Sequence, residues 1–283
     1  MGGAVWRIRG GALPLDRPRI LGVLNVTPDS FSDGGRYTTV DAALAHARRL
    51  VAEGADVLDV GGESTRPGAD PVSVEEELRR VVPVLERLRR ELPGVPVSID
   101  TAKPEVAEAA LRLGAHVVND VTGLSQPAMV DLVARWGAGA VVMHMRGTPK
   151  TMQDNPVYDD VVAEVAAFLR SACAEAEAAG VPRAALVVDP GLGFGKTVEH
   201  NWTLLRRLPE LAATGYPVLV GPSRKRFLGA ALGVAAPPEA RDVATAAVCA
   251  LAWVRGARLF RVHAVAPARD ALAVAYAFAP EVS

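Results

Sequence analysis

The chain has 283 residues, of which 50% are hydrophobic and 22% are charged. This composition is typical of a globular protein with enough apolar material for a large core. The formal net charge of −1 argues against nucleic-acid or membrane binding through bulk electrostatics. No apolar stretch is long enough for a membrane span, and the first ten residues lack the apolar core of a signal peptide. For the two cysteines, Cys173 and Cys249, we expect buried free thiols in a cytoplasmic protein.

Short apolar runs alternate with amphipathic stretches along the whole chain. Runs with strand character cover 20–24, 57–60, 96–99, 117–118, 140–143, 186–188, 218–220 and 259–262. Helical patterns follow them over 40–53, 73–91, 104–113, 128–136, 159–179, 202–211, parts of 225–256, and 268–278. Local signals support several boundaries: Ser73 and Glu76 form a capping-box pattern, and Gly54 and Gly114 stand where helices should stop.

Eight consecutive βα units predict one α/β domain, a TIM (β/α)8 barrel over residues 19–283. We expect residues 1–18 to form an N-terminal extension that packs on this barrel. No shift in composition suggests a linker between domains. A doubly wound open sheet is the alternative, but no G-x-G-x-x-G motif follows the first strand.

Nearly every predicted strand ends in a polar residue. In chain order these residues are Asn25, Asp59, Asp100, Asn119, Asp120, His144, Asp189, Ser223, Lys225, Arg261 and His263. Each one taken alone could cap a helix or satisfy a loop. The carboxyl ends of barrel strands meet at one mouth, however, and active sites lie there. The whole set therefore predicts a single polar site.

The first strand leads into an unusually long polar loop, Asn25-Val26-Thr27-Pro28-Asp29-Ser30-Phe31-Ser32-Asp33-Gly34-Gly35. Pro28 prevents the loop from continuing as a helix, and the glycine pair allows a sharp turn. Most βα connections are only a few residues long, and long loops on rigid scaffolds tend to carry function. The length of this loop therefore favours a functional role.

This loop resembles the first signature of the dihydropteroate synthases. The segment Asp59-Val60-Gly61-Gly62-Glu63-Ser64-Thr65-Arg66-Pro67-Gly68 resembles their second signature. The family's remaining motifs follow in order as Ile99-Asp100-Thr101, Asn119-Asp120, Met143-His144-Met145, Asp189 to Lys196, Gly221 to Lys225, and Arg261-Val262-His263. The resemblance implies a pterin-binding barrel that condenses (7,8-dihydropterin-6-yl)methyl diphosphate with 4-aminobenzoate, giving 7,8-dihydropteroate and diphosphate for folate synthesis. It also implies a homodimer.

The resemblance assigns the pterin to residues whose chemistry fits the ring. Asp189 would accept the two adjacent donors of the pterin, the 2-amino group and N3–H. Asn119 and Asp100 would bind the remaining ring edge, and Lys225 the carbonyl and a ring nitrogen. Lysine occurs only at 103, 150, 196 and 225 in this arginine-rich chain, which favours a specific role for the ammonium. For Lys103 and Lys150 a solvated surface position is the alternative.

The diphosphate needs cations and hydrogen-bond donors. Arg261 and His263 lie two residues apart on the last strand and therefore face the same side, next to the first strand and Asn25. The resemblance implies that they bind the diphosphate and that Asn25 gives one oxygen ligand to Mg²⁺, which keeps waters and substrate phosphates as its other ligands. A core histidine is the alternative for His263. His144 has no such role, and we interpret it as structural.

The 4-aminobenzoate site is expected in the loops, from Thr65, Arg66, Pro67, Phe194 and Ser223. A solvated arginine is the alternative for Arg66. The arylamine is neutral at pH 7, so the reaction requires no general base. We therefore predict a dissociative substitution in which Lys225, Asp100, Arg261 and His263 act with Mg²⁺. The competing hypotheses are a pterin barrel of the methyltransferase type and a non-catalytic pterin-binding paralogue.

Overall fold

A computed structural model describes residues 4–27, 36–64, 68–233 and 237–279. Its centre is a closed barrel of parallel strands in the order β10-β3-β4-β5-β6-β7-β8-β9. The strands are β3 (Arg19–Asn25), β4 (Val57–Gly61), β5 (Val97–Asp100), β6 (Val117–Asp120), β7 (Gly139–Met143), β8 (Leu186–Asp189), β9 (Val218–Val220) and β10 (Ala257–Val262). The predicted TIM barrel is confirmed.

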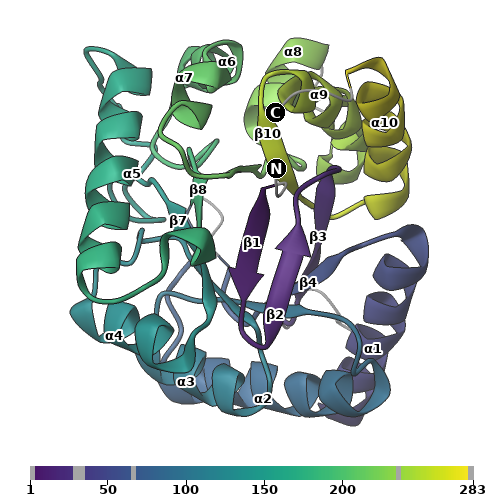
Figure 1. The fold of residues 1–283 in the computed structure, drawn as a ribbon. Helices are drawn as coiled ribbons and strands as arrows, with labels where there is room; N and C mark the ends of the chain where they lie inside the picture. The colour runs from purple at the N-terminus through teal and green to yellow at the C-terminus, as the bar shows by residue number, and fades with distance from the viewer. Residues whose placement is uncertain (1–3, 28–35, 65–67, 234–236, 280–283) are drawn as a thin grey trace.

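Helices surround the barrel as an outer ring (Figure 1). They are α1 (Arg36–Glu53), α2 (Val74–Glu91), α3 (Pro104–Arg112), α4 (Pro127–Trp136), α5 (Val161–Ala178), α6 (Val198–Arg206), α7 (Leu208–Ala212), α8 (Arg226–Leu232), α9 (Asp242–Val254) and α10 (Val265–Phe278). The single helix predicted over 202–211 is wrong. The structure has two helices there, because the backbone at Arg207 leaves the helical region (φ −103°, ψ 21°) just before Pro209.

The predicted capping box of α2 is half present. The Ser73 side chain accepts a hydrogen bond from the Glu76 backbone N–H, as expected for an N-cap. The carboxylate of Glu76, however, accepts from Arg79 and Arg80 on its own helix. The arginines of the first two turns therefore engage the group that a full capping box would use.

The strands separate two cores because side chains alternate between the two faces of a strand. Outward residues such as Leu24, Val60, Ile99 and Val142 pack against the helices in one large cluster. Inward residues at the amino-terminal ends form a second cluster inside the barrel: Leu21, Val57, Val117, Val141, Val187, Leu219 and Leu259. The barrel interior is thus apolar at this end.

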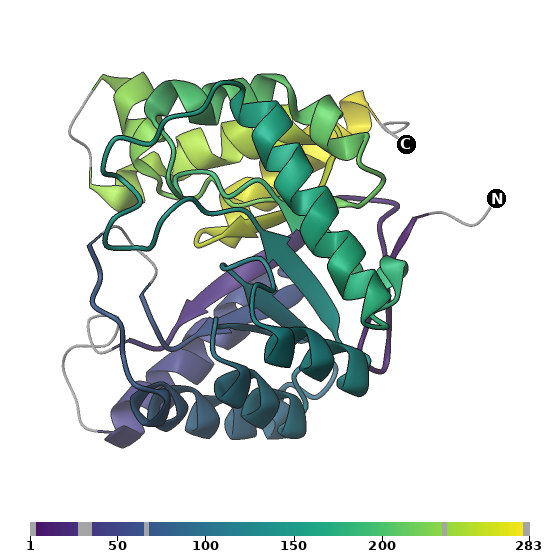
Figure 2. The same cartoon turned by 90° about the vertical axis from the view of Figure 1, so that its left-hand side faces the viewer.

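A hairpin of β1 (Val5–Ile8) and β2 (Gly11–Pro14) covers the amino-terminal end of the barrel. Trp6, Ile8 and Leu15 are buried in the inner cluster of the barrel. The indole Nε1 of Trp6 donates to the Ala185 carbonyl, 2.9 Å away, just before β8. Figure 2 shows the hairpin on the right-hand side of the barrel.

The structure also tests the expectation for the two cysteines. Cys173 in α5 and Cys249 in α9 are free and buried, as predicted, and burial raises the pKa of the Cys173 thiol to about 12. Such thiols are poor nucleophiles at neutral pH. Within the described ranges, no helix combines the length and the apolarity that crossing a bilayer demands.

Candidate active site

The barrel interior changes from apolar to polar between one inward-facing position of a strand and the next. Two residues beyond the inner apolar cluster, the inward positions hold Asp59 on β4, Asn119 on β6, Asp189 on β8 and Arg261 on β10. On β5 the corresponding step runs from Ser98 to Asp100. Because these residues occupy the carboxyl ends of parallel strands, their side chains meet at one mouth.

Arg261 joins two buried carboxylates at this mouth. Its Nε donates to Asp59 Oδ2 and its Nη2 to Asp100 Oδ2, both at 2.6 Å. Asp59 is fully buried and Asp100 is 6% exposed. One oxygen of each carboxylate, Oδ1, has no hydrogen-bond partner among the described residues. The cluster therefore contains two buried acceptors that a bound donor could satisfy.

The ionisable groups of this cluster shift one another's pKa values. Burial is the largest influence on Asp100 and raises the pKa of its carboxyl to about 7, against the attraction of Arg261. The nearby charge of Asp59 raises the pKa further. The two carboxylates in turn raise the pKa of Arg261 despite its burial. The guanidinium therefore remains charged throughout the physiological range.

Two amides flank the same cluster. Asn119 Nδ2 donates to Asp59 Oδ2 at 3.3 Å. Asn25, at the end of β3, pairs in register with Gly61 on β4. A Cβ atom on Gly61 would lie 3.5 Å from Asp100 Oδ2 and 3.8 Å from Asn25 Oδ1. Gly61 thus leaves space between the amide oxygen and the carboxylate.

Asp189 and Lys225 form a second part of the mouth. Asp189 Oδ1 accepts from the Gly191 backbone N–H at 2.7 Å. Burial raises the pKa of Asp189, and Lys225 is the strongest influence against it. Burial likewise lowers the pKa of Lys225 to about 8, and Asp189 opposes that shift. Lys225 Nζ donates to the Leu192 carbonyl and lies 4.6 Å from the ring centroid of Phe194.

The loop after β8 passes very close to the end of β7. Gly191 has a φ of +66°, and a Cβ atom there would lie 1.9 Å from the His144 carbonyl oxygen. A Cβ atom on Gly195 (φ +63°) would lie 2.4 Å from the Arg146 carbonyl oxygen. Only glycine fits either position, since both the backbone conformation and the space exclude a side chain. The glycines of the Asp189–Lys196 motif therefore hold Phe194 beside Lys225.

Lys196 cross-links this loop to the end of β7. Its Nζ lies 3.0 Å from His144 Nδ1 and donates to the carbonyls of His144 (3.4 Å) and Phe194 (2.9 Å). Both side chains are buried, and the edge of the His144 ring packs on Phe168 at 5.0 Å. Burial lowers the pKa of His144 to about 3, so its imidazole is neutral.

His263 lies with Ser223 in a third part of the mouth. The Ser223 Oγ accepts from the backbone N–H of His263 at 3.1 Å and lies 2.9 Å from His263 Nδ1. Arg261 and His263, expected to act side by side, thus contact different partners here. Thr65, Arg66 and Pro67, which the sequence assigned to 4-aminobenzoate, lie outside the described residues.

The polar strand ends predicted from the sequence include Asp59, but neither Asp59 nor Lys196 was assigned a role there. Asp59 contacts both Arg261 and Asn119, two residues that the sequence had assigned to substrates. A signal was available, because Asp59 stands two residues after Val57 and two before Gly61 and therefore shares their inward face. Asp120, one position out of phase with Asn119, caps its own loop by accepting from the N–H groups of Thr122 and Leu124.

The donor set at the mouth suits a loosely held divalent cation rather than a protein cage. Among the described residues, no three His, Cys, Asp or Glu side chains are grouped as metal ligands. Asn25 offers a single amide oxygen beside the space over Gly61. One protein oxygen is compatible with Mg²⁺, which keeps several waters and binds substrate phosphates.

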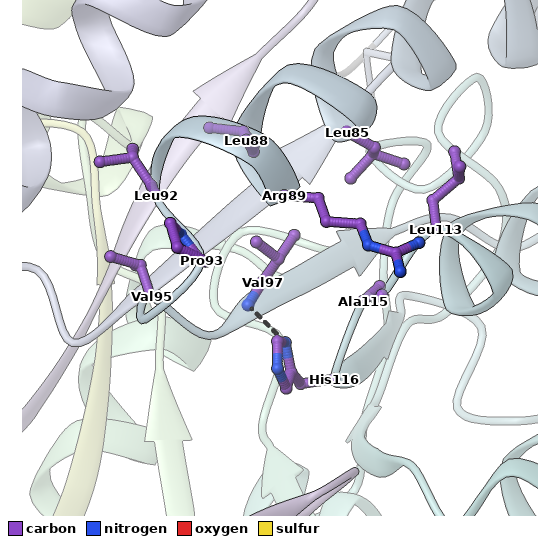
Figure 3. A pocket seen from close by; sticks show the side chains of 11 residues that line it. Leu85, Leu88, Arg89, Leu92, Pro93, Val95, Val97, Leu113, Ala115 and His116 are labelled. Atoms are coloured by element: carbon purple, nitrogen blue, oxygen red, sulfur yellow. Dashed lines mark hydrogen bonds between the residues drawn. The ribbon is translucent and has the colours of Figure 1, made fainter.

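A cavity of about 290 Å³ lies around the starts of β5 and β6, at the end of the barrel away from the mouth. Figure 3 shows the side chains that line it. It is lined mainly by leucine side chains at the ends of α2 and α3 and by Val95 and Val97 around the start of β5, together with Arg89 and His116. His116 Nδ1 accepts from the Val97 backbone N–H at 3.1 Å. This histidine therefore satisfies the start of β5, at the end of the strand away from the mouth.

Comparisons with known proteins find relatives over nearly the whole chain. The family model described as "Pterin binding enzyme" matches residues 21–263. The dihydropteroate synthase of Escherichia coli (strain K12) is 46% identical over 266 residues, 94% of this chain and 93% of that protein. The structure of Xanthomonas albilineans dihydropteroate synthase with 4-aminobenzoic acid has a TM-score of 0.90 and 52% identity, covering 97% of this chain and 98% of that one. For the Thermus thermophilus dihydropteroate synthase in complex with 6HMPPP the TM-score is 0.84 and the identity 51%, covering 96% of this chain and 99% of that one.

Proposed function

The chain belongs to the dihydropteroate synthases of the pterin-binding enzyme family, and from that membership we propose how its barrel mouth divides the work of the reaction. The family transfers the pterin methylene group from diphosphate to the amine of 4-aminobenzoate. The observation that carries the proposal is the step from apolar to polar side chains inside the barrel. It gathers Asp59, Asp100, Asn119, Asp189 and Arg261 above a closed apolar layer.

The pterin ring binds deepest in the mouth, against Asp189, Asn119, Asp100 and Lys225. The carboxylate of Asp189, already oriented by the Gly191 N–H, accepts the 2-amino and N3–H donors of the ring. Asp100 Oδ1 offers a further buried acceptor. A buried acceptor without a partner is costly, so a ligand that satisfies it gains affinity over one that does not.

The diphosphate binds above the pterin, against Arg261 and His263. The described residues engage Nε and Nη2 of Arg261, which leaves Nη1 for a phosphate oxygen. Asn25 would hold Mg²⁺ through its amide oxygen; when bound, the ion stabilises charge on the leaving diphosphate. Asp59 holds the guanidinium in place from below.

4-Aminobenzoate binds at the outer rim. Phe194 offers its ring face, and Ser223, held by His263, offers a hydroxyl. Thr65, Arg66 and Pro67 complete this subsite in the proposal. The amine is neutral at pH 7 and needs no base, so the protein's task is to stabilise the departing negative charge with Arg261 and His263. The substitution is therefore dissociative.

The direct test incubates the purified protein with pterin diphosphate, 4-aminobenzoate and Mg²⁺ and measures dihydropteroate. Turnover is expected, and excess chelator should abolish it while binding of the bare pterin survives. Arg261→Ala and His263→Ala should weaken diphosphate binding more than bare pterin binding. Pterin binding without turnover would instead support the non-catalytic paralogue, and methyl transfer from methyltetrahydrofolate would support the methyltransferase type.

We also propose a cytoplasmic homodimer. The neighbouring helices α9 and α10 expose the apolar side chains Val243, Leu251, Val274 and Phe278, each between 60% and 80% exposed. A second copy of the chain would cover such side chains. Light scattering coupled to gel filtration should give twice the chain mass, and Leu251→Glu should shift it towards the monomer. A wild-type monomer at micromolar concentration would contradict the proposal.

A further inference from the structure

Lys103 bridges two carboxylates outside the substrate mouth. It directly precedes α3, and its Nζ donates to Glu63 Oε2 and, at 2.6 Å, to Glu77 Oε2. Its side chain is 20% exposed and that of Glu77 is fully buried. Burial lowers the pKa of Lys103, but the bonds to the two carboxylates outweigh it and raise the pKa overall. The expected alternative of a simply solvated lysine is therefore wrong for Lys103.

Glu63 uses its other oxygen to join the two ends of the β4–α2 loop. Its Oε1 accepts from the backbone N–H of Val72 at 3.1 Å, across the segment 64–71. The preceding residue is fixed as well, because Arg80 Nη1 donates to the Gly62 carbonyl at 2.8 Å. A Cβ atom on Gly62 would lie 2.7 Å from Val81 Cγ1, so the chain lies directly on α2.

Stability alone is a poor reason for this arrangement. Glu77 is fully buried, and its Oε1 has no hydrogen-bond partner among the described residues. Removing two carboxylates and an ammonium from water costs about as much as their attraction returns, and apolar residues of similar size often serve stability as well. What the ion pairs supply is geometry, since Lys103 connects the start of α3, the side of α2 and both ends of the loop.

We infer that Lys103 and Glu63 are positioning residues for 4-aminobenzoate: through their ion pair they set where the β4–α2 loop leaves the barrel and where it returns. The inference rests on the proposed function, which assigns Thr65, Arg66 and Pro67 of this loop to the second substrate. Of the proposed pterin contacts, Asn119, Asp189 and Lys225 come from other βα units. Asp100 lies three residues before Lys103, but its carboxylate is held by Arg261. Loss of the ion pair should therefore affect the two substrates unequally.

Lys103→Met tests this in steady-state kinetics with the full-length protein. The KM for 4-aminobenzoate should rise about tenfold or more, because a small misplacement of binding groups is costly. The KM for pterin diphosphate and the calorimetric affinity for bare pterin should stay within about twofold. Lys103→Arg, which keeps the charge, should recover most of the loss. The matched control is Lys150→Met, which removes the exposed 2.7 Å ion pair of Lys150 with Asp70 on the same loop and should change neither KM.

Lys103→Met also leaves two carboxylates unpaired, so a second variant separates positioning from folding. Glu77→Gln combined with Lys103→Met removes the buried charge and should restore the melting temperature while the KM for 4-aminobenzoate stays high. A wild-type KM in this double variant, or a parallel rise of both KM values in either variant, would overturn the inference. Failure of the proposed function is distinguishable, because the wild-type protein would then make no dihydropteroate at all.

Discussion

At the scale of single residues, the mouth is dominated by Arg261 and its two carboxylate partners. Asp59 and Asp100 each present one oxygen to the guanidinium and keep one oxygen without a partner among the described residues. Two carboxyl groups against one guanidinium leave the cluster with an excess of acceptor oxygens. This suits a ligand that brings hydrogen-bond donors, as a pterin does, together with a counter-cation for its diphosphate.

Asp189→Asn should lower kcat/KM by about 10²-fold or more. The substitution keeps the size of the side chain but places an amide where the pterin donors require a carboxylate. Circular dichroism and thermal melting should show that the barrel remains folded. The measurement is the steady-state rate at varied pterin diphosphate, and near wild-type kcat/KM would remove Asp189 from the pterin site.

Asp120→Asn is the matched control for that variant. Asp120 also ends a barrel strand, but its carboxylate caps the loop over Thr122 and Leu124. We therefore expect reduced stability with kcat/KM close to wild type.

His144 should make stability depend on pH. Burial lowers its pKa from 6.5 to about 3 in the folded protein, while the unfolded chain keeps the ordinary value. The contribution is therefore complete above about pH 6.5 and is lost as pH falls towards about 3. Between pH 7 and pH 5 the free energy of unfolding should fall by about 2 kcal/mol on account of this residue. Urea titrations of wild type and His144→Asn at the two pH values measure this fall in the free energy of unfolding. The amide oxygen of the asparagine can replace Nδ1 without titrating. An equal fall in both proteins would exclude His144 as the cause.

At the scale of elements, loops and strands differ in how far their sequence determines them. The strands were found from their apolar runs, and the break between α6 and α7 had its own signal in Pro209. The β4–α2 loop is different, since its ties are to distant segments: Gly68 N–H donates to the Pro149 carbonyl, and Glu63 contacts Lys103. These contacts depend on how neighbouring βα units stand beside each other.

The two substrates should bind in order. The segments that join β3 to α1 and β4 to α2, expected from the sequence at 25–37 and 63–72, are rich in Gly, Pro, Ser and Asp, and their sequences offer few apolar side chains. Fixing such loops costs conformational entropy, and 4-aminobenzoate alone is too small to offset that cost. Diphosphate with Mg²⁺ supplies several charge-assisted contacts that can offset it. We therefore expect weak binding of 4-aminobenzoate alone and a gain of about 1–3 kcal/mol when pterin, diphosphate and Mg²⁺ are present.

Calorimetric titration with and without the other three components decides this order. Analogues with a sulfonyl group in place of the carboxyl should show the same dependence. Equal affinities in the two titrations would mean that the second site is preformed.

At the scale of the whole molecule, the amino-terminal hairpin closes the end of the barrel that the active site does not use. Trp6→Ala should therefore lower the free energy of unfolding by about 3–5 kcal/mol, the usual cost of removing a buried tryptophan. Because the mouth lies at the other end, kcat/KM of the folded fraction should change little. Val5→Ala, at an exposed position of the same strand, is the control. Unchanged stability on urea titration of Trp6→Ala would show that the hairpin does not contribute to the barrel core.

The sequence by itself determined the barrel and the rim of polar strand ends, because both follow from local patterns: apolar runs, helix signals and the residue that ends each run. Only the tertiary structure decided which of those residues pair. Arg261 meets Asp59 from 202 residues away and Asp100 from 161 residues away. Lys196 meets His144 across 52 residues. The Arg261 pairs form only when β10 closes against β3 and the strand registers bring the inward positions to one level. The Lys196 pair needs β8 beside β7. No local pattern encodes either arrangement.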